Sequence, residues 1–162
     1  MRHLCQPENL TLAYFCDSYR QADGDQCLAN EAARFLTTTE FDFAFVYFGT
    51  VDTAGHDYGW LSPEYLAQLE RVDHAFGTLV AALPDDTTLL VQSDHGGPDH
   101  NHWTDRPEDM TIPWLIAGPD IRSGYEIQAA ISLLDTAPTL ARLLNLKPHP
   151  DWEGRCIEEI FR

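Results

Sequence analysis

The sequence is short of basic residues and of long hydrophobic runs. Lys and Arg together number 10 against 26 Asp and Glu, so the formal net charge is −16 over 162 residues. A surface this acidic repels phosphate backbones, which excludes non-specific binding to a nucleic-acid duplex. No run of about 18 apolar residues is present, so the sequence predicts no transmembrane helix and no membrane partner.

Cysteines are also few, and none of them forms a CxxC pair; they are Cys5, Cys16, Cys27 and Cys156. This spacing disfavours a structural zinc knuckle, and four cysteines are too few for a disulfide framework in a chain of this length. We therefore expect free, mostly buried thiols in a reducing compartment. Residues 6–9 interrupt any apolar signal-peptide core, so the predicted location is cytoplasmic, provided that Met1 is the natural start.

Apolar runs and amphipathic segments alternate along the chain. Strands are expected at 42–49, 87–92 and 112–117, with a further candidate at 10–15; helices are expected at 26–38, 62–83 and 133–144. The run at 42–49 is almost wholly apolar, which is typical of a strand buried on both faces of a parallel sheet. The strand–helix–strand order from 42 to 92 predicts a right-handed parallel crossover. We expect residues 1–162 to form a single α/β domain with a mostly parallel sheet.

Two acidic-histidine clusters each follow a predicted strand. The five residues concerned are Asp52 and His56, Asp94 and His95, and the later His102. Ligands collect at the carboxyl ends of strands in open α/β sheets, and carboxylate and imidazole are common ligands of divalent metals. Each residue alone has a simpler explanation, such as a helix cap, a turn or a surface histidine. Metal binding is the simplest explanation of all five together.

The spacing within the clusters suits shared ligation. The first pair lies four residues apart, so both side chains can reach one ion from a helical turn or a tight loop, and Gly55 allows a backbone conformation that other residues resist. Asp94 and His95 lie past the strand end, where Gly96 and Gly97 turn the chain, so they could bind one ion jointly or two ions separately. His102 could return to complete a ligand shell.

Other polar and aromatic residues near the clusters carry weaker indications. His100 lies in a polar loop and is a less certain ligand, and His74 is predicted to be structural or exposed. Tyr58 and Trp60 flank the first cluster and could stack on a base or an aryl group, although packing of the loop is the favoured interpretation. The substrate-binding residues remain unassigned.

The clusters resemble the alkaline phosphatase superfamily, and within it the type I phosphodiesterase/nucleotide pyrophosphatase branch. The matching motifs are Asp52-x-x-Gly55-His56, Ser93-Asp94-His95-Gly96 and His102, with supporting runs at 55–60, 107–114, 135–139 and 152–155. The resemblance covers about residues 40–160. It implies an alkaline phosphatase-like three-layer αβα fold with a mostly parallel sheet.

The resemblance also implies two divalent ions, commonly zinc, with manganese or iron fitting nearly as well. Asp52, His56 and His102 would hold one ion, and Asp94 and His95 would belong to the other. The implied function is metal-dependent hydrolysis of phosphoric esters, with a small phosphorylated substrate. Alternatives are a sulfatase, phosphonate hydrolase or phosphomutase of the same superfamily, or a non-catalytic metal-binding remnant.

One departure from the family pattern concerns the N-terminal region. The family's Thr or Ser nucleophile and a further ligand Asp lie upstream of the matching residues, so no catalytic residue is assigned. The nearest candidates are Asp17-Ser18 and Thr37–Thr39, and neither fits a strand followed by a nucleophile. We expect the C-terminal portion of such a domain, lacking its N-terminal strands, with Met1 as an internal start. An exposed sheet edge would then favour self-association.

Overall fold

A computed structural model describes residues 10–16 and 21–162 of the chain. The chain forms two compact units. The first unit comprises residues 1–83 with 99–101, and the second comprises 84–98 with 102–162. The single domain expected over 1–162 stays a prediction. Within the described ranges, no helix is both long enough and apolar enough to cross a membrane.

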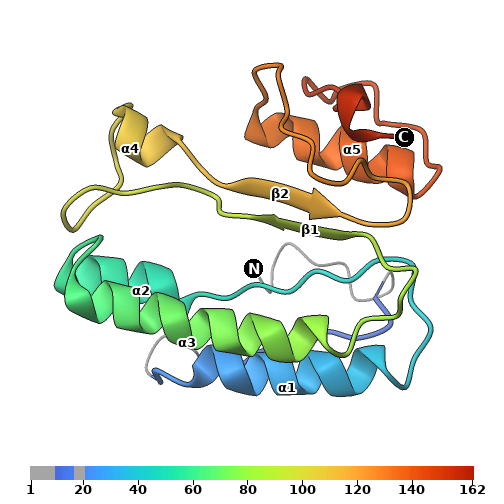
Figure 1. The fold of residues 1–162 in the computed structure, drawn as a ribbon. Coiled ribbons are helices and arrows are strands. Elements are labelled where there is room, and N and C mark those ends of the chain that lie inside the picture. Colours follow the sequence, from blue (N-terminus) through green and yellow to red (C-terminus); the bar gives the residue numbers. More distant parts are fainter. Residues whose placement is uncertain (1–9, 17–20) are drawn as a thin grey trace. The chain divides into compact units, whose positions relative to one another are not determined.

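The described residues of the first unit form three helices: α1 (Gly24–Leu36), α2 (Thr50–Tyr58) and α3 (Pro63–Val80). The α3 helix packs along α1 and also contacts α2, as Figure 1 shows. Ala29 of α1 and Ala75 of α3 are fully buried, because their small side chains let the helix backbones approach closely. Leu36 and Leu79 are buried as well and complete the apolar contact.

The start of α3 agrees with the sequence prediction. Ser62 caps the helix by accepting a hydrogen bond from the Tyr65 amide at 3.1 Å, and Pro63 occupies the first helical turn. The helix ends at Val80, before the predicted end at Leu83, and residues 81–83 continue as hydrogen-bonded turns.

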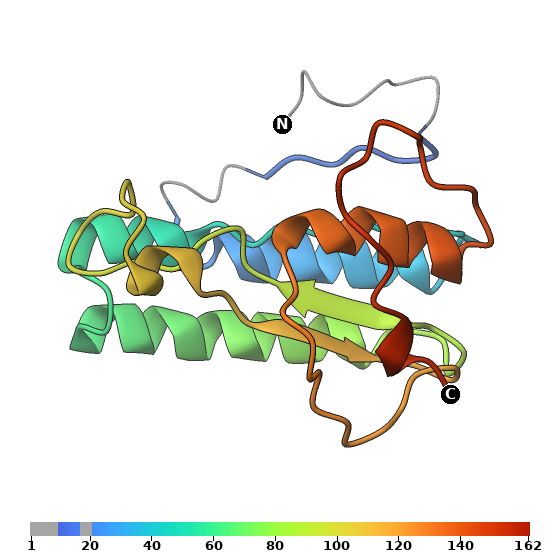
Figure 2. The same cartoon turned by 90° about the horizontal axis from the view of Figure 1, so that it is seen from above.

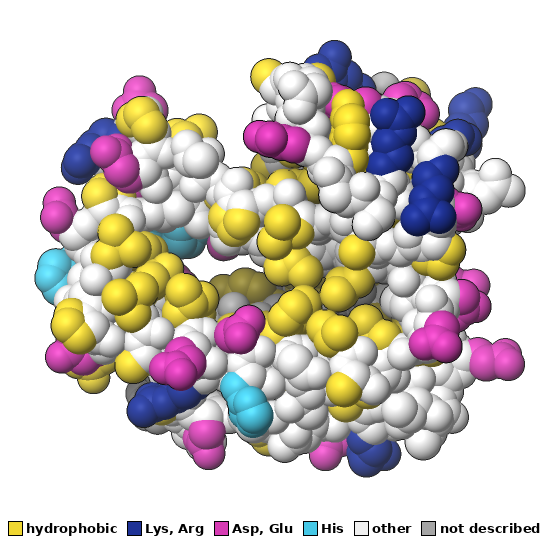
Figure 3. All heavy atoms as spheres, viewed as in Figure 1, with side chains coloured by type: hydrophobic (Ala, Val, Ile, Leu, Met, Phe, Trp, Pro, Cys, Tyr) yellow, Lys and Arg dark blue, Asp and Glu magenta, His cyan; other side chains and the backbone are white. Residues whose placement is uncertain are grey.

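The apolar face predicted for α3 is only partly covered. Leu66 is 49% exposed and Leu69 is 44% exposed. Hydrophobic side chains are accordingly visible among the surface atoms of the face drawn in Figure 3. The periodicity correctly predicted the helix, but it overestimated how much of this face is buried.

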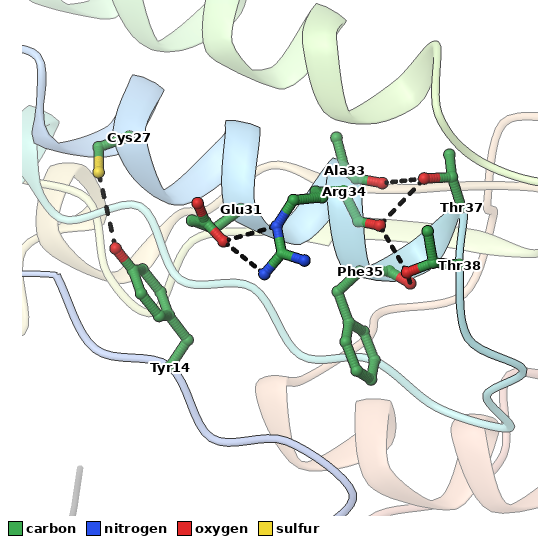
Figure 4. A network of polar contacts seen from close by, with 8 residues as sticks. All are labelled: Tyr14, Cys27, Glu31, Ala33, Arg34, Phe35, Thr37 and Thr38. Carbon is green, nitrogen blue, oxygen red and sulfur yellow. Dashed lines mark hydrogen bonds and ion pairs between the residues drawn. The ribbon is translucent and has the colours of Figure 1, made fainter.

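Two threonines follow the last turn of α1, which ends two residues earlier than predicted. The Thr37 hydroxyl donates to the carbonyls of Ala33 and Arg34, and the Thr38 hydroxyl donates to those of Arg34 and Phe35 (Figure 4). Carbonyls near a helix end have no amide partner further along the helix, so hydroxyl donors there stabilise the termination.

The strand expected at 42–49 is not formed among the described residues, and neither is the candidate strand at 10–15. Residues 41–49 run without ladder hydrogen bonds into α2, with Phe43 53% exposed and Phe45 69% exposed. A strand needs a neighbour to pair its amides and carbonyls, and the described part of the first unit supplies none. The predicted parallel crossover is therefore absent from the described structure.

The second unit contains the strand pair β1 (Leu89–Gln92) and β2 (Trp114–Ala117), within the ranges predicted from the sequence. The strands are antiparallel, with Leu89 opposite Ala117 and Gln92 opposite Trp114 (Figure 2). This ladder is the sheet that the described residues form, so the mostly parallel sheet expected from the resemblance is not confirmed.

The second unit also contains short helices and a core of buried isoleucines. The helices are α4 (Pro107–Met110), η3 (Leu133–Asp135), α5 (Thr136–Leu143) and η4 (Glu158–Ile160). Ile121, Ile157 and Ile160 form the buried core, against which Trp114 and Phe161 pack. The start of η3 is closed by a capping box, in which the Ser132 amide donates to the Asp135 carboxylate at 2.9 Å.

The described cysteines are less buried than expected. Cys27 is an exposed free thiol, whereas Cys16 and the free thiol Cys156 are partly buried. Burial, reinforced by the neighbouring Glu158 carboxylate, raises the pKa of Cys156 to about 11, so this thiol stays protonated at neutral pH.

Candidate metal centre

The first unit brings Asp52 and His56 together on α2. The residues lie one helical turn apart on one face, and Asp52 Oδ1 is 3.4 Å from His56 Nε2. Both side chains are about one-third exposed, whereas the Asp52 Oδ1 atom itself is buried. The sequence left a helical turn and a tight loop open, and the structure shows the helix.

The imidazole of His56 is oriented by a reciprocal pair of hydrogen bonds with His100. His56 Nδ1 lies 2.9 Å from the His100 carbonyl, and His100 Nδ1 lies 3.0 Å from the His56 carbonyl. A carbonyl oxygen only accepts, so each Nδ1 must carry the hydrogen. In the neutral ring the lone pair of His56 is then on Nε2, which faces Asp52. His100, a less certain candidate from the sequence, orients a predicted ligand.

Gly55 is required for a different reason from the one expected. It lies inside α2 and its φ is not positive, but a Cβ atom there would lie 2.6 Å from the Trp60 indole. The Trp60 ring also meets His56 edge-on, with centroids 5.1 Å apart. The Trp60 ring therefore packs as interpreted, with Gly55 giving it space beside the histidine, whereas Tyr58, for which packing was also expected, is 57% exposed.

The second unit brings together the other three predicted ligands. Asp94 and His95 follow β1, with Asp94 Oδ1 3.7 Å from His95 Nε2. The ring of His102 stacks on that of His95 at a centroid distance of 3.5 Å and an interplanar angle of 10°. His95 Nδ1 lies 2.7 Å from the Gly96 carbonyl, so this ring also carries its hydrogen on Nδ1 and its lone pair on Nε2.

Asp109 of α4 ties together the two segments that carry these histidines. Its backbone carbonyl accepts from the Gly96 amide at 2.7 Å, next to His95. Its carboxylate accepts from both the amide and the hydroxyl of Thr104, two residues after His102. Asp109 is 2% exposed, so these bonds are shielded from competing water. A Cβ at position 96 would lie 2.1 Å from the Glu108 carbonyl, so only glycine permits this approach.

The donor groups suit a divalent ion. Zinc lies about 2.0–2.1 Å from its nitrogen and oxygen ligands, so two ligand atoms on one tetrahedral ion are about 3.3 Å apart. The distance of 3.4 Å between Asp52 and His56 matches that spacing. In each unit a backbone carbonyl fixes the tautomer that presents Nε2, which is the usual arrangement around a metal-binding histidine.

The nucleophile candidates remain unassigned. Asp17-Ser18 lies outside the described residues. Thr37 and Thr38 use their hydroxyls at the end of α1, as described above. The roles of the buried Asp25 and Asp109 were not predicted from the sequence, because the folded chain decides which groups they bind. The sequence indicated these roles only by placing an acidic residue beside a helix start.

The orientation of the histidines is directly testable. We expect His56 and His95 to occupy the Nδ1–H tautomer in nitrogen-correlated NMR spectra of the metal-free chain, recorded about two units above the ordinary histidine pKa of about 6.5. The exposed His74 of α3 serves as the internal control, and His-to-Gln variants assign the resonances. The Nε2–H form at His56 or His95 would contradict the assigned hydrogen bonds.

Comparison with known proteins gives a consistent family. A sequence model described as type I phosphodiesterase / nucleotide pyrophosphatase matches residues 8–113. The catalytic subunit of human GPI ethanolamine phosphate transferase 3 is 29% identical over 164 residues, covering 96% of this chain and 15% of the relative. The 2,3-bisphosphoglycerate-independent phosphoglycerate mutase of a Synechococcus strain is 25% identical over 142 residues, which cover 80% of this chain and 26% of the relative. Arylsulfatase K of Danio rerio is 34% identical over 89 residues, which cover 49% of this chain and 17% of the relative.

The chain therefore spans only 15 to 26% of the length of these relatives. No solved structure matches it. The family match covers well over half of the chain and includes the Asp52 and Asp94 motifs, as well as His102. The resemblance inferred from those motifs is confirmed, and the chain belongs to the type I phosphodiesterase / nucleotide pyrophosphatase family.

Proposed function

We propose that this chain supplies the metal-binding part of a metal-dependent hydrolase of phosphoric esters. The observation that carries the proposal is the same in both units: an aspartate lies beside the Nε2 atom of a histidine whose Nδ1 is fixed by a carbonyl. Membership of a phosphodiesterase and pyrophosphatase family supports it, because the matched range, residues 8–113, contains all of these residues.

The proposed ligand sets follow the family pattern. Asp52, His56 and His102 hold one divalent ion, and Asp94 and His95 belong to a second; zinc is the proposed metal. When bound, paired ions of this kind activate a nucleophile, steady the leaving oxygen and neutralise charge on the phosphoryl oxygens. The carbonyls of His100 and Gly96 hold the two imidazoles in the tautomer that ligation needs.

The charge balance of the chain supports a role for cations. With a net charge of −16, the protein repels a phosphorylated substrate unless bound cations reverse the local field. The proposed substrate is therefore a small phosphoric ester that approaches a metal-loaded site. The family's nucleophile and further aspartate are not assigned in this chain, so it is proposed to be incomplete as a catalyst.

A second candidate is the hydrolysis of sulfate esters, which the similarity to an arylsulfatase supports. Phosphonate hydrolysis and phosphomutase chemistry are further alternatives, and a phosphoglycerate mutase is among the relatives. A panel of nitrophenyl phosphate, phosphodiester, phosphonate and sulfate esters, offered to a longer protein that contains this chain, separates these reactions.

Substitution of the ligands tests metal binding directly. We expect Asp52→Ala and His102→Ala each to weaken zinc binding at least about 10-fold, since even indirect partners of metal ligands have effects of this size. Affinity is measured by competition with a chromophoric chelator, and bound metal by elemental analysis. His74→Ala, an exposed substitution on α3, is the matched control. Unchanged affinity in both ligand variants would overturn the metal proposal.

The isolated chain should show little or no hydrolysis of a nitrophenyl phosphodiester, even when loaded with zinc or manganese. The physical reason is that no nucleophile has been assigned that would be positioned to attack the phosphorus. Metal ions without such a group supply only part of the rate acceleration. Release of nitrophenolate is followed with metal-free protein as the blank. Robust turnover that disappears in Asp94→Ala would show that the chain contains a nucleophile after all.

The isolated chain should also associate with itself through residues 41–49. Phe43 and Phe45 point to solvent from a segment without ladder hydrogen bonds, which offers an unpaired edge to a second copy. We expect light scattering after size exclusion to show oligomers, and Phe43→Lys/Phe45→Lys to shift them toward monomer. Leu146→Lys changes an equally exposed apolar residue of the second unit and serves as the control. A monomeric wild-type chain would refute this expectation.

A further inference from the structure

A buried carboxylate from α1 binds the start of the helix that carries Asp52 and His56. Asp25 is 1% exposed and lies in the first turn of α1. Its Oδ1 accepts from the Gly49 amide at 3.1 Å, and its Oδ2 accepts from the Thr50 amide at 3.0 Å and the Thr50 hydroxyl at 2.6 Å. Both oxygens therefore serve the N-terminus of α2.

The α3 helix completes this network. Gln68 donates to the Thr50 hydroxyl oxygen at 2.7 Å and to the Ala22 carbonyl at 2.9 Å, and its own amide oxygen accepts from Arg71 at 3.1 Å. Thr50 and Gln68 are buried like Asp25, so water offers little substitute for these bonds. One buried polar group thus joins α1, α2 and α3.

Asp25 caps the N-terminus of α2. The N-cap residue is Gly49, which has no side chain to accept from the first amides of the helix. The carboxylate of Asp25 takes that place from a neighbouring helix. It lies at the N-termini of both α1 and α2, where the aligned peptide dipoles favour negative charge.

This cap matters for Asp52 because of its position in the helix. Asp52 is the third residue of α2, and an acidic side chain there commonly folds back to accept from the N-cap amide. Asp135 does so in the second unit, where it accepts from Ser132. In α2 the corresponding amide, that of Gly49, already donates to Asp25. The Asp52 carboxylate instead lies beside His56, one turn further along the helix.

We propose that Asp25 is a positioning residue: by binding the N-cap amide of α2, it keeps Asp52 turned toward His56 and away from its own helix end. This inference rests on the proposed role of Asp52 and His56 as metal ligands. Asp25 itself touches neither the metal nor the substrate in this scheme. Its effect is on which way an adjacent ligand points.

The experiment compares metal binding with stability in a set of variants of the full chain. Asp25→Ala removes the acceptor of the Gly49 amide, and Asp25→Asn retains the side-chain shape but sets an NH₂ group against one of the two amides. Thr50→Val is the matched control, because it breaks the bonds to the hydroxyl while Asp25 still binds both backbone amides. Leu36→Ala destabilises α1 at its other end.

Three readouts separate positioning from general destabilisation: zinc affinity by chelator competition, the visible absorption spectrum of bound Co²⁺, and the midpoint of urea unfolding. We expect all four variants to unfold at lower urea concentration. Only the Asp25 variants should weaken zinc binding, by about 10-fold to 100-fold, and alter the Co²⁺ spectrum. If Asp25→Ala fails to fold, Asp25→Asn decides the comparison.

Asp52→Ala is run in parallel so that the two proposals can fail separately. If Asp52→Ala leaves zinc affinity unchanged, the proposed metal function is wrong. If Asp52→Ala weakens binding but the Asp25 variants retain wild-type affinity and spectrum, the positioning role is wrong and the metal function stands. Equal losses of affinity in Thr50→Val, Leu36→Ala and Asp25→Asn would also refute positioning, because stability alone would explain them.

Discussion

The first unit depends on one buried acidic side chain. Asp25 accepts three hydrogen bonds at the start of α2, and Gln68 of α3 binds the Thr50 hydroxyl in the same network. Burying a carboxylate is costly unless donors replace its water shell, and here backbone amides and a hydroxyl do so. Since the network joins three helices, the same bonds that hold the unit together fix where its candidate ligands lie.

The second unit uses a comparable arrangement with different parts. Asp109 binds Gly96 through its carbonyl and Thr104 through its carboxylate, so a single short helix holds the segments that carry His95 and His102. In both units the candidate metal ligands are exposed or partly exposed. They lie on a helix in the first unit and on loops in the second, and a buried aspartate fixes the backbone that carries them. Pre-positioned ligands of this kind lose little freedom when they bind an ion.

What the sequence could predict follows from the range of the interactions involved. The start of α3 was predictable, because Ser62 and Pro63 act on amides within the same turn. The strand at 42–49 was not, because an apolar run becomes a strand only where another strand pairs with it. The candidate ligands were recognisable from motif spacing, whereas the orientation of His56 by His100, 44 residues away, could be read only from the folded chain.

The face-to-face rings of His95 and His102 have a chemical consequence of their own. Two neutral imidazoles can stack with their centroids 3.5 Å apart without charge repulsion, whereas two imidazolium ions at that separation would repel each other strongly. Neutral rings are also the only ones that can offer a lone pair to a cation. The neutral form therefore suits both the stacked arrangement of these two rings and a role as lone-pair donors.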